Sequence, residues 1–159
     1  MNSLAPILLF VVLLIFVVVA LMRLKSPGPP YEKRKSLLTD SELRFYGVLR
    51  KSAEDWAICS MVRIADLIRV KPDTPKRQAW LNRILAKHVD FVLCNPETME
   101  VVLAIELDDR SHQRADRVER DEFVNDAFKA AGLPLLRVKV QEDYDGKELK
   151  ASIAKTMSA

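Results

Sequence analysis

The chain has 159 residues, with 25 Lys or Arg against 22 Asp or Glu, a formal net charge of +3 at pH 7 and two cysteines. This length supports one domain of ordinary size plus an appendage, and so small a charge is no argument by itself for nucleic-acid binding. The two cysteines, Cys59 and Cys94, both fall in apolar runs. This placement favours reduced core residues over a disulfide or a metal site.

The first predicted element is an uncharged apolar segment, "LAPILLFVVLLIFVVVALM", at residues 4–22. A helix of about 19 residues spans roughly 28 Å, close to the hydrocarbon thickness of a bilayer. A cleaved signal peptide usually has a basic start, a shorter apolar run and a small-residue cleavage site. The segment lacks these features, so we expect an uncleaved transmembrane anchor.

Basic residues follow this segment and predict its orientation: Arg23, Lys25, Lys33, Arg34 and Lys35. Loops rich in Lys and Arg tend to stay in the cytoplasm. We therefore expect a single-pass protein of the inner (cytoplasmic) membrane, with its C-terminal domain in the cytoplasm. The segment 23–37 contains the proline-rich run "KSPGPPYEKRK" and is interpreted as a basic linker, and residues 38–159 as the folded domain.

Hydrophobic periodicity in the domain alternates between that of helices and that of strands. A capping box from Thr39 to Glu42 marks the start of the first helix. The predicted elements are a helix at 40–53, a strand reaching about Ile64, a helix-like segment at 76–88, strands at 89–95 and 100–108 joined by the hairpin turn "NPETM", an amphipathic helix in 115–133 with Gly132 as its C-cap, a strand at 134–140 and a terminal helix at 147–157. This order predicts an α/β domain with a mixed sheet flanked by helices.

Three acids are expected to converge at one edge of this sheet. Glu106 and Asp108 lie two residues apart on one strand and so share a face, and Asp90 lies within the neighbouring strand of the hairpin. Three carboxylates at a strand end form a hard-oxygen site suited to Mg²⁺ or Mn²⁺. An ion-pair network explains the same acids, with Glu106 paired to one of the arginines that follow the strand: Arg110, Arg114, Arg117 and Arg120.

The quoted motifs carry a resemblance to a known superfamily. The chain has "VDF" at 89–91, "AIELDDRSH" at 104–112, "RDEF" at 120–123 and "AAGLPLLRV" at 130–138. In this order, over about residues 38–140, they resemble the restriction-endonuclease-like core of the PD-(D/E)xK nucleases, and most closely the branch of the very-short-patch repair endonucleases. The chain also resembles a bacterial family of small anchored proteins, the domain of unknown function 2726.

This resemblance implies metal binding by Asp90 and Glu106. Asp108 stands where the wider superfamily has a lysine, so His112 is the expected substitute as a general base or phosphate donor. Glu42, in the first helix, corresponds to a further carboxylate near the metal, or caps that helix. Asp121 is expected to orient His112, or to pair with Arg117 or Arg120.

Two functions follow as expectations from the resemblance. The first is a membrane-anchored, Mg²⁺- or Mn²⁺-dependent phosphodiester hydrolase, with the four arginines on the phosphate backbone and with DNA a more expected partner than RNA. The second is a catalytically inactive nuclease-fold domain that serves as a membrane-tethered binding or scaffold module. Neither motif nor composition identifies a protein partner.

Overall fold

The computed structural model describes residues 4–24, 28–108 and 115–158, and for residues 24 and 115–119 the backbone alone. The chain divides into two compact units, Met1–Lys35 and Ser36–Ala159. In the first unit, helix α1 (Ala5–Leu24) extends two residues past the expected end of the apolar segment. Its stretch Ala5–Arg23 is long and apolar enough to cross a membrane, by length and composition.

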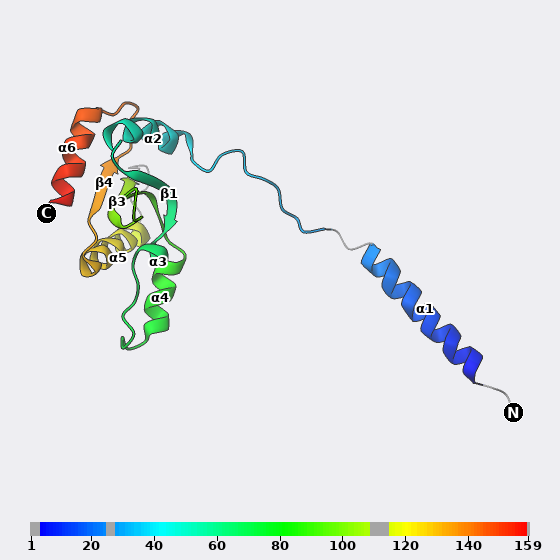
Figure 1. The fold of residues 1–159 in the computed structure, drawn as a ribbon. Coiled ribbons are helices and arrows are strands. Elements are labelled where there is room, and N and C mark those ends of the chain that lie inside the picture. The colour runs from blue at the N-terminus through cyan, green and yellow to red at the C-terminus, as the bar shows by residue number, and fades with distance from the viewer. Residues whose placement is uncertain (1–3, 25–27, 109–114, 159) are drawn as a thin grey trace. The chain divides into compact units, whose positions relative to one another are not determined.

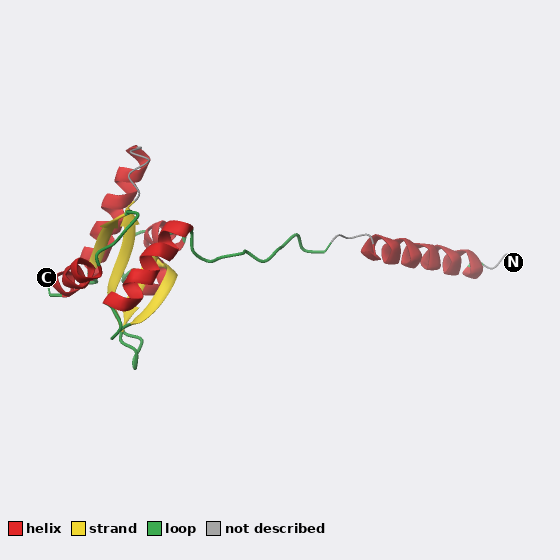
Figure 2. Cartoon of the chain, turned by 90° about the horizontal axis from the view of Figure 1, so that it is seen from above, coloured by secondary structure: helices red, strands yellow, loops and turns green. Residues whose placement is uncertain are grey.

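The second unit is a mixed α/β domain, with helices on both sides of a four-stranded sheet (Figures 1 and 2). Its elements in chain order are α2 (Asp40–Ser52), β1 (Ala57–Arg63), α3 (Ile64–Leu67), α4 (Arg77–Leu85), β2 (His88–Cys94), β3 (Val101–Asp108), α5 (Ala115–Ala131), β4 (Leu135–Lys139) and α6 (Gly146–Met157). The predicted mixed sheet flanked by helices is confirmed.

The strands lie in the order β1-β2-β3-β4. The first three form an antiparallel meander. Helix α5 then carries the chain back to the end of the sheet at which β3 begins, so β4 runs parallel to β3. The predicted hairpin between β2 and β3 is confirmed, with Phe91 opposite Ile105. Its turn is closed by Asn95, whose side-chain oxygen accepts hydrogen bonds from the backbone N–H groups of Glu97 and Thr98.

Alternation along the strands divides the core between the two faces of the sheet. On one face, α2 and α6 pack on Phe91, Leu93, Leu103 and Ile105. On the other face, α3, α4 and α5 contribute Ile64, Ile84, Val124 and Phe128, which pack in one cluster with Val92 and Ala104. Because Ala104 belongs to the α5 side, Glu106 and Asp108, at two-residue steps along β3, also face that side.

Local signals explain where most helices begin and end. The capping box of α2 is formed, with the Thr39 N–H donating to Glu42 Oε2 at 2.7 Å. Gly132 ends α5 with a φ of 69°, a left-handed conformation that glycine adopts without strain, as predicted. The helix expected at 76–88 is shorter, because Lys76 has a left-handed φ of 53° and His88 already belongs to β2. The short helix α3 was not predicted.

Candidate functional site

Asp90 lies inside β2 and its side chain is bound to the neighbouring strand. The Leu107 N–H donates to Asp90 Oδ2 at 2.6 Å, so the carboxylate takes the place of a ladder acceptor near the end of β3. On the other side of β2, Ser60 pairs with Phe91 and Val62 with Val89, while Met61 between them has a left-handed φ of 56°. The regular ladder between β1 and β2 is therefore interrupted opposite Asp90.

Among the described acids, Glu106 has a strongly raised pKa. Its Oε2 atom is buried and has no hydrogen-bond partner among the described residues. Burial, together with the nearby charge of Asp90, raises the pKa of Glu106 to about 7, although Arg137 and Arg120 act in the opposite direction. A buried carboxyl oxygen without a partner is costly, so this atom marks a place where a proton or a cation would be stabilising.

The pKa of Asp90 is also raised. Burial is the main cause, and the charges of Glu42 and Asp108 add to it, while the Leu107 N–H and Arg120 lower the pKa. The bond from the Leu107 N–H to Asp90, and the position of Glu106 and Asp108 on one face at the end of β3, bring the three predicted carboxylates to one end of the sheet. Partly buried acids with raised pKa values are typical of functional sites, and structural ion-pair networks produce the same effect.

Arg137 of β4 brings a positive charge to this cluster. Its Nη1 donates to Asp108 Oδ1 at 2.7 Å and its Nε donates to Asn125 Oδ1 at 3.0 Å. Its Nη2 lies 3.6 Å from Asp121 Oδ1 and makes no hydrogen bond among the described residues. The guanidinium therefore joins β3, β4 and α5, and the register places Arg137 directly beside Glu106.

The other candidate residues have varied positions. Glu42 caps α2 and, through its charge, raises the pKa of Asp90, so its capping role and its nearness to the cluster hold together. The Oδ1 atom of Asp121 lies 3.6 Å from Nη2 of Arg137, and the contacts expected of Asp121 with His112 and Arg117 involve side chains outside the described residues. His112, Arg110 and Arg114 lie outside the described residues, as does the side chain of Arg117, and Arg120 is exposed on α5.

The donor atoms fit a hard divalent cation in part. Asp90 and Glu106 offer carboxylate oxygens at one end of the sheet, and Glu106 Oε2 has its lone pairs unused by described residues. Asp108, in contrast, is held by Arg137. Within the described residues, no three His, Cys, Asp or Glu side chains form a ready metal-binding group. Asp90 and Glu106 are thus the ligands that fit best, and Asp108 would join them only by leaving Arg137.

Arg137 lies in the "LLRV" motif, and the sequence pattern by itself indicates no role for it. The available signal was its position, since a cation in the middle of a short apolar strand needs a partner, as Asp90 does in β2. Which acid it meets depends on β4 lying next to β3, and the sequence pattern does not determine that neighbour. The expectation that a nearby arginine in the chain pairs with the acids overlooked this more distant one.

The geometry defines a mixed α/β domain with a partly buried acidic cluster at one end of its sheet. The chain belongs to the family described as protein of unknown function (DUF2726), whose model matches residues 34–157. Among curated proteins and among solved structures, no match was found.

Proposed function

We propose that the unit Ser36–Ala159 is a PD-(D/E)xK-type nuclease domain that hydrolyses phosphodiester bonds in DNA with Mg²⁺ or Mn²⁺. The observation that carries the proposal is the convergence of Asp90 and Glu106 at one sheet end, with Glu106 Oε2 buried and unpartnered among the described residues. The order of a β-hairpin, a crossover helix and a parallel strand supports it, because the resemblance of the motifs implies such a core.

In this proposal the chain's own residues would bind the metal ion, accept a proton and contact the phosphate. A bound divalent cation would polarise the phosphate and lower the pKa of an attacking water. Asp90 and Glu106 would hold the cation, and the bond from the Leu107 N–H fixes the orientation of Asp90. His112 is proposed to take the proton from the water, and Arg120 to contact the phosphate backbone.

A second candidate function is supported by Arg137. Because its guanidinium is bonded to Asp108 at 2.7 Å, a fixed cation already neutralises part of the acidic cluster. An arginine in such a position stabilises the acids without a metal. This arrangement favours a nuclease-fold domain that has no activity and serves as a membrane-tethered binding or scaffold module.

Cleavage by the full-length chain in detergent micelles separates these functions. Single-stranded and duplex DNA and RNA are incubated with Mg²⁺, Mn²⁺ or EDTA, and Asp90→Asn and Glu106→Gln are compared with wild type. The exposed acid Asp143 provides the matched control, Asp143→Asn. We expect metal-dependent cleavage by wild type and the control, and a loss of at least 100-fold in both site variants. Cleavage unchanged by either site substitution would reject the site.

The melting temperature reports metal binding without requiring activity. A ligand that binds only the native state stabilises it, so Mn²⁺ should raise the melting temperature of wild type but not that of the Asp90→Asn/Glu106→Gln double variant. A metal-dependent shift without cleavage of any substrate favours the inactive binding module. The absence of both a shift and cleavage contradicts the metal site itself.

The N-terminal helix is proposed to anchor this domain to the inner membrane with the domain on the cytoplasmic side. The support is the length and apolar composition of Ala5–Arg23 and the basic residues that follow it. Fusion of a reporter that is active only in the cytoplasm to the C-terminus tests the orientation. A reporter active only on the outer side of the membrane would contradict it.

A further inference from the structure

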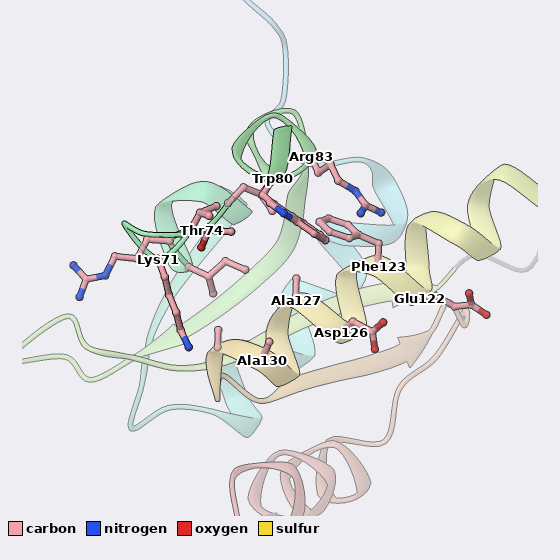
Figure 3. Close-up of a pocket in the computed structure, with 14 residues that line it drawn as sticks. Lys71, Thr74, Trp80, Arg83, Glu122, Phe123, Asp126, Ala127 and Ala130 are labelled. Carbon is pink, nitrogen blue, oxygen red and sulfur yellow. The ribbon is translucent and has the colours of Figure 1, made fainter. Parts of the chain in front are cut away.

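A pocket of about 580 Å³ lies between the segment that follows α3, helix α4 and helix α5 (Figure 3). This volume is within the range of small-ligand sites. Its apolar lining includes Ile68, Val70 and Ile84, and α5 contributes Ala127 and Ala130. Because these alanines have short side chains, the α5 wall leaves the space open. None of the lining residues belongs to the acidic cluster at the sheet end.

Flat groups are stacked on one wall of the pocket. The guanidinium carbon of Arg83 lies 3.8 Å from the centre of the Phe123 ring and 5.3 Å from that of Trp80. Trp80 is nevertheless 45% exposed. Figure 3 shows Trp80 and Phe123 side by side at the top of the pocket, with Ala127 and Ala130 below them. An exposed indole held by an arginine is a preformed platform on which a planar ligand stacks.

The rim of the pocket carries opposite charges on opposite sides. The segment after α3 contributes the cations Arg69 and Lys71, and α5 contributes the acids Glu122 and Asp126. In Figure 3, Lys71 lies on one side of the pocket and Asp126 with Glu122 on the other. A complementary ligand is therefore planar in the middle, anionic at one end and a hydrogen-bond donor at the other.

We propose that this pocket binds a nucleobase together with its attached phosphate, either as a free nucleotide or as one unit of a single-stranded nucleic acid. The base stacks on Trp80 above the alanines, Lys71 and Arg69 contact the phosphate, and Asp126 accepts a hydrogen bond from an amino group of the base. Bases stack on aromatic side chains in this way without sequence preference, whereas cations at the rim recognise the phosphate.

The proposal goes beyond the nuclease function and does not depend on it. On α5, Asp121 and Asn125 contact Arg137, whereas Glu122 and Asp126 line the pocket. Ligand binding here therefore needs no metal and is measured in EDTA, which prevents metal-dependent cleavage. The Asp90→Asn/Glu106→Gln double variant is expected to bind the ligand as wild type does, so failure of one proposal is distinguishable from failure of the other.

Fluorescence of Trp80 measures the binding directly. The chain has two tryptophans, so Trp56→Phe in the full-length chain in detergent micelles leaves Trp80 as the reporter. The probes are AMP, GMP, CMP and UMP, the nucleoside adenosine, and hexamers of single-stranded DNA and RNA. We expect saturable quenching by the phosphate-bearing probes. If the hexamers bind more tightly than the mononucleotides, the ligand is a nucleic-acid strand. If the mononucleotides bind as tightly as the hexamers, the ligand is a free nucleotide.

Variants test which residues contact the ligand. Because the Trp80 variants lack the fluorescent reporter, their binding is measured by the anisotropy of a fluorescein-labelled probe. Trp80→Ala should weaken binding about 10-fold or more, while Trp80→Phe retains most of it. Lys71→Glu should weaken the binding of AMP but not that of adenosine, which lacks the phosphate. Lys150→Glu, at an exposed position on α6, is the matched control. Ala130→Leu should fill the pocket and abolish binding without loss of melting temperature, because Ala130 is exposed.

Two results would overturn the proposal. One is the absence of saturable quenching by any nucleotide or hexamer while the melting temperature shows an intact fold. The other is binding that is unchanged in Trp80→Ala and Ala130→Leu, since the ligand would then occupy another surface.

Discussion

Arg137 and Glu106 are neighbours on adjacent strands but are satisfied to different degrees. Arg137 has hydrogen bonds to Asp108 and Asn125, while Glu106 Oε2 is buried without a partner among the described residues. Arg137 thus stabilises the half-exposed Asp108, whereas the buried Glu106 needs a proton or an added cation. This division decides how the cluster responds to pH.

Stability should fall as the pH rises through the titration of Glu106. The folded pKa of about 7 exceeds the ordinary value of 4.5, so the folded state holds this proton more tightly than the unfolded chain does. The resulting stabilisation is complete below about pH 4.5 and is lost by pH 7, and 2.5 pH units at 1.36 kcal/mol each amount to roughly 3 kcal/mol.

Glu106→Gln should remove that pH dependence, because the amide stays neutral. Urea unfolding at pH 5 and pH 8, without divalent metal, measures it. We expect a smaller loss of stability between these two pH values in Glu106→Gln than in wild type. Glu148→Gln, an exposed acid on α6, is the control and should behave as wild type does. An equal loss of stability between pH 5 and pH 8 in Glu106→Gln and wild type would contradict the raised pKa of Glu106.

Arg137→Met tests whether this arginine occupies the place of a metal. The substitution frees Asp108 and should cost about 1 kcal/mol, a low value because the Asp108 side chain is 39% exposed. It should also enlarge the shift in melting temperature caused by Mn²⁺, since Asp108 can then bind the ion together with Asp90 and Glu106. Lys139→Met, an exposed change on the same strand, is the control. A smaller Mn²⁺ shift than in wild type would show that Arg137 supports the metal site.

At the scale of elements, α2 contributes to both the core and the electrostatics of the site. Phe45 and Leu49 pack on the sheet face opposite α5, while Glu42 caps the helix and raises the pKa of Asp90. Its last turn is tied to α6 by the Ser52 hydroxyl, which donates to the Gly146 carbonyl at 3.0 Å. The position of Glu42 relative to the acids is therefore fixed by packing at both ends of α2.

Loss of the N-cap should destabilise the domain without altering its site chemistry. Thr39→Ala removes the side-chain acceptor for the Glu42 N–H and should cost about 1 kcal/mol. Thermal unfolding measures the change. Arg44→Ala, at an exposed position in the same helix, is the control and should be nearly neutral. A Thr39→Ala variant as stable as this control would show that the capping box contributes nothing.

At the scale of the whole molecule, an apolar helix precedes a domain that carries its own core. If α1 spans a membrane, charge at its centre should prevent insertion, because Arg costs roughly 3 kcal/mol there. Leu13→Arg/Val17→Arg should therefore move the chain from the membrane fraction, resistant to high salt and alkaline washing, to the soluble fraction. Leu21→Arg, near the end of the helix, should remain with the membrane. A wild-type chain released by alkaline washing would contradict the anchor.

Several parts of this protein could be predicted from patterns within single segments. The capping box of α2, the β2–β3 hairpin, the glycine that ends α5 and the α/β class all follow from patterns within a few residues of one another. The same period-two rule placed Glu106 and Asp108 on one face, and the hairpin placed Asp90 beside them. These features were predictable because each depends on backbone geometry and burial along a single segment.

Contacts between groups far apart in the chain could not be predicted in the same way. The crossover through α5 brings β4 next to β3, and this neighbour gives Asp108 and Asp121 their partner Arg137. The packing of α4 against α5 is likewise a tertiary contact. It stacks Arg83 on Phe123 and leaves a pocket beside Trp80. The physical reason is that periodicity specifies which face of an element is buried, whereas the contacts between elements depend on how those faces pack together.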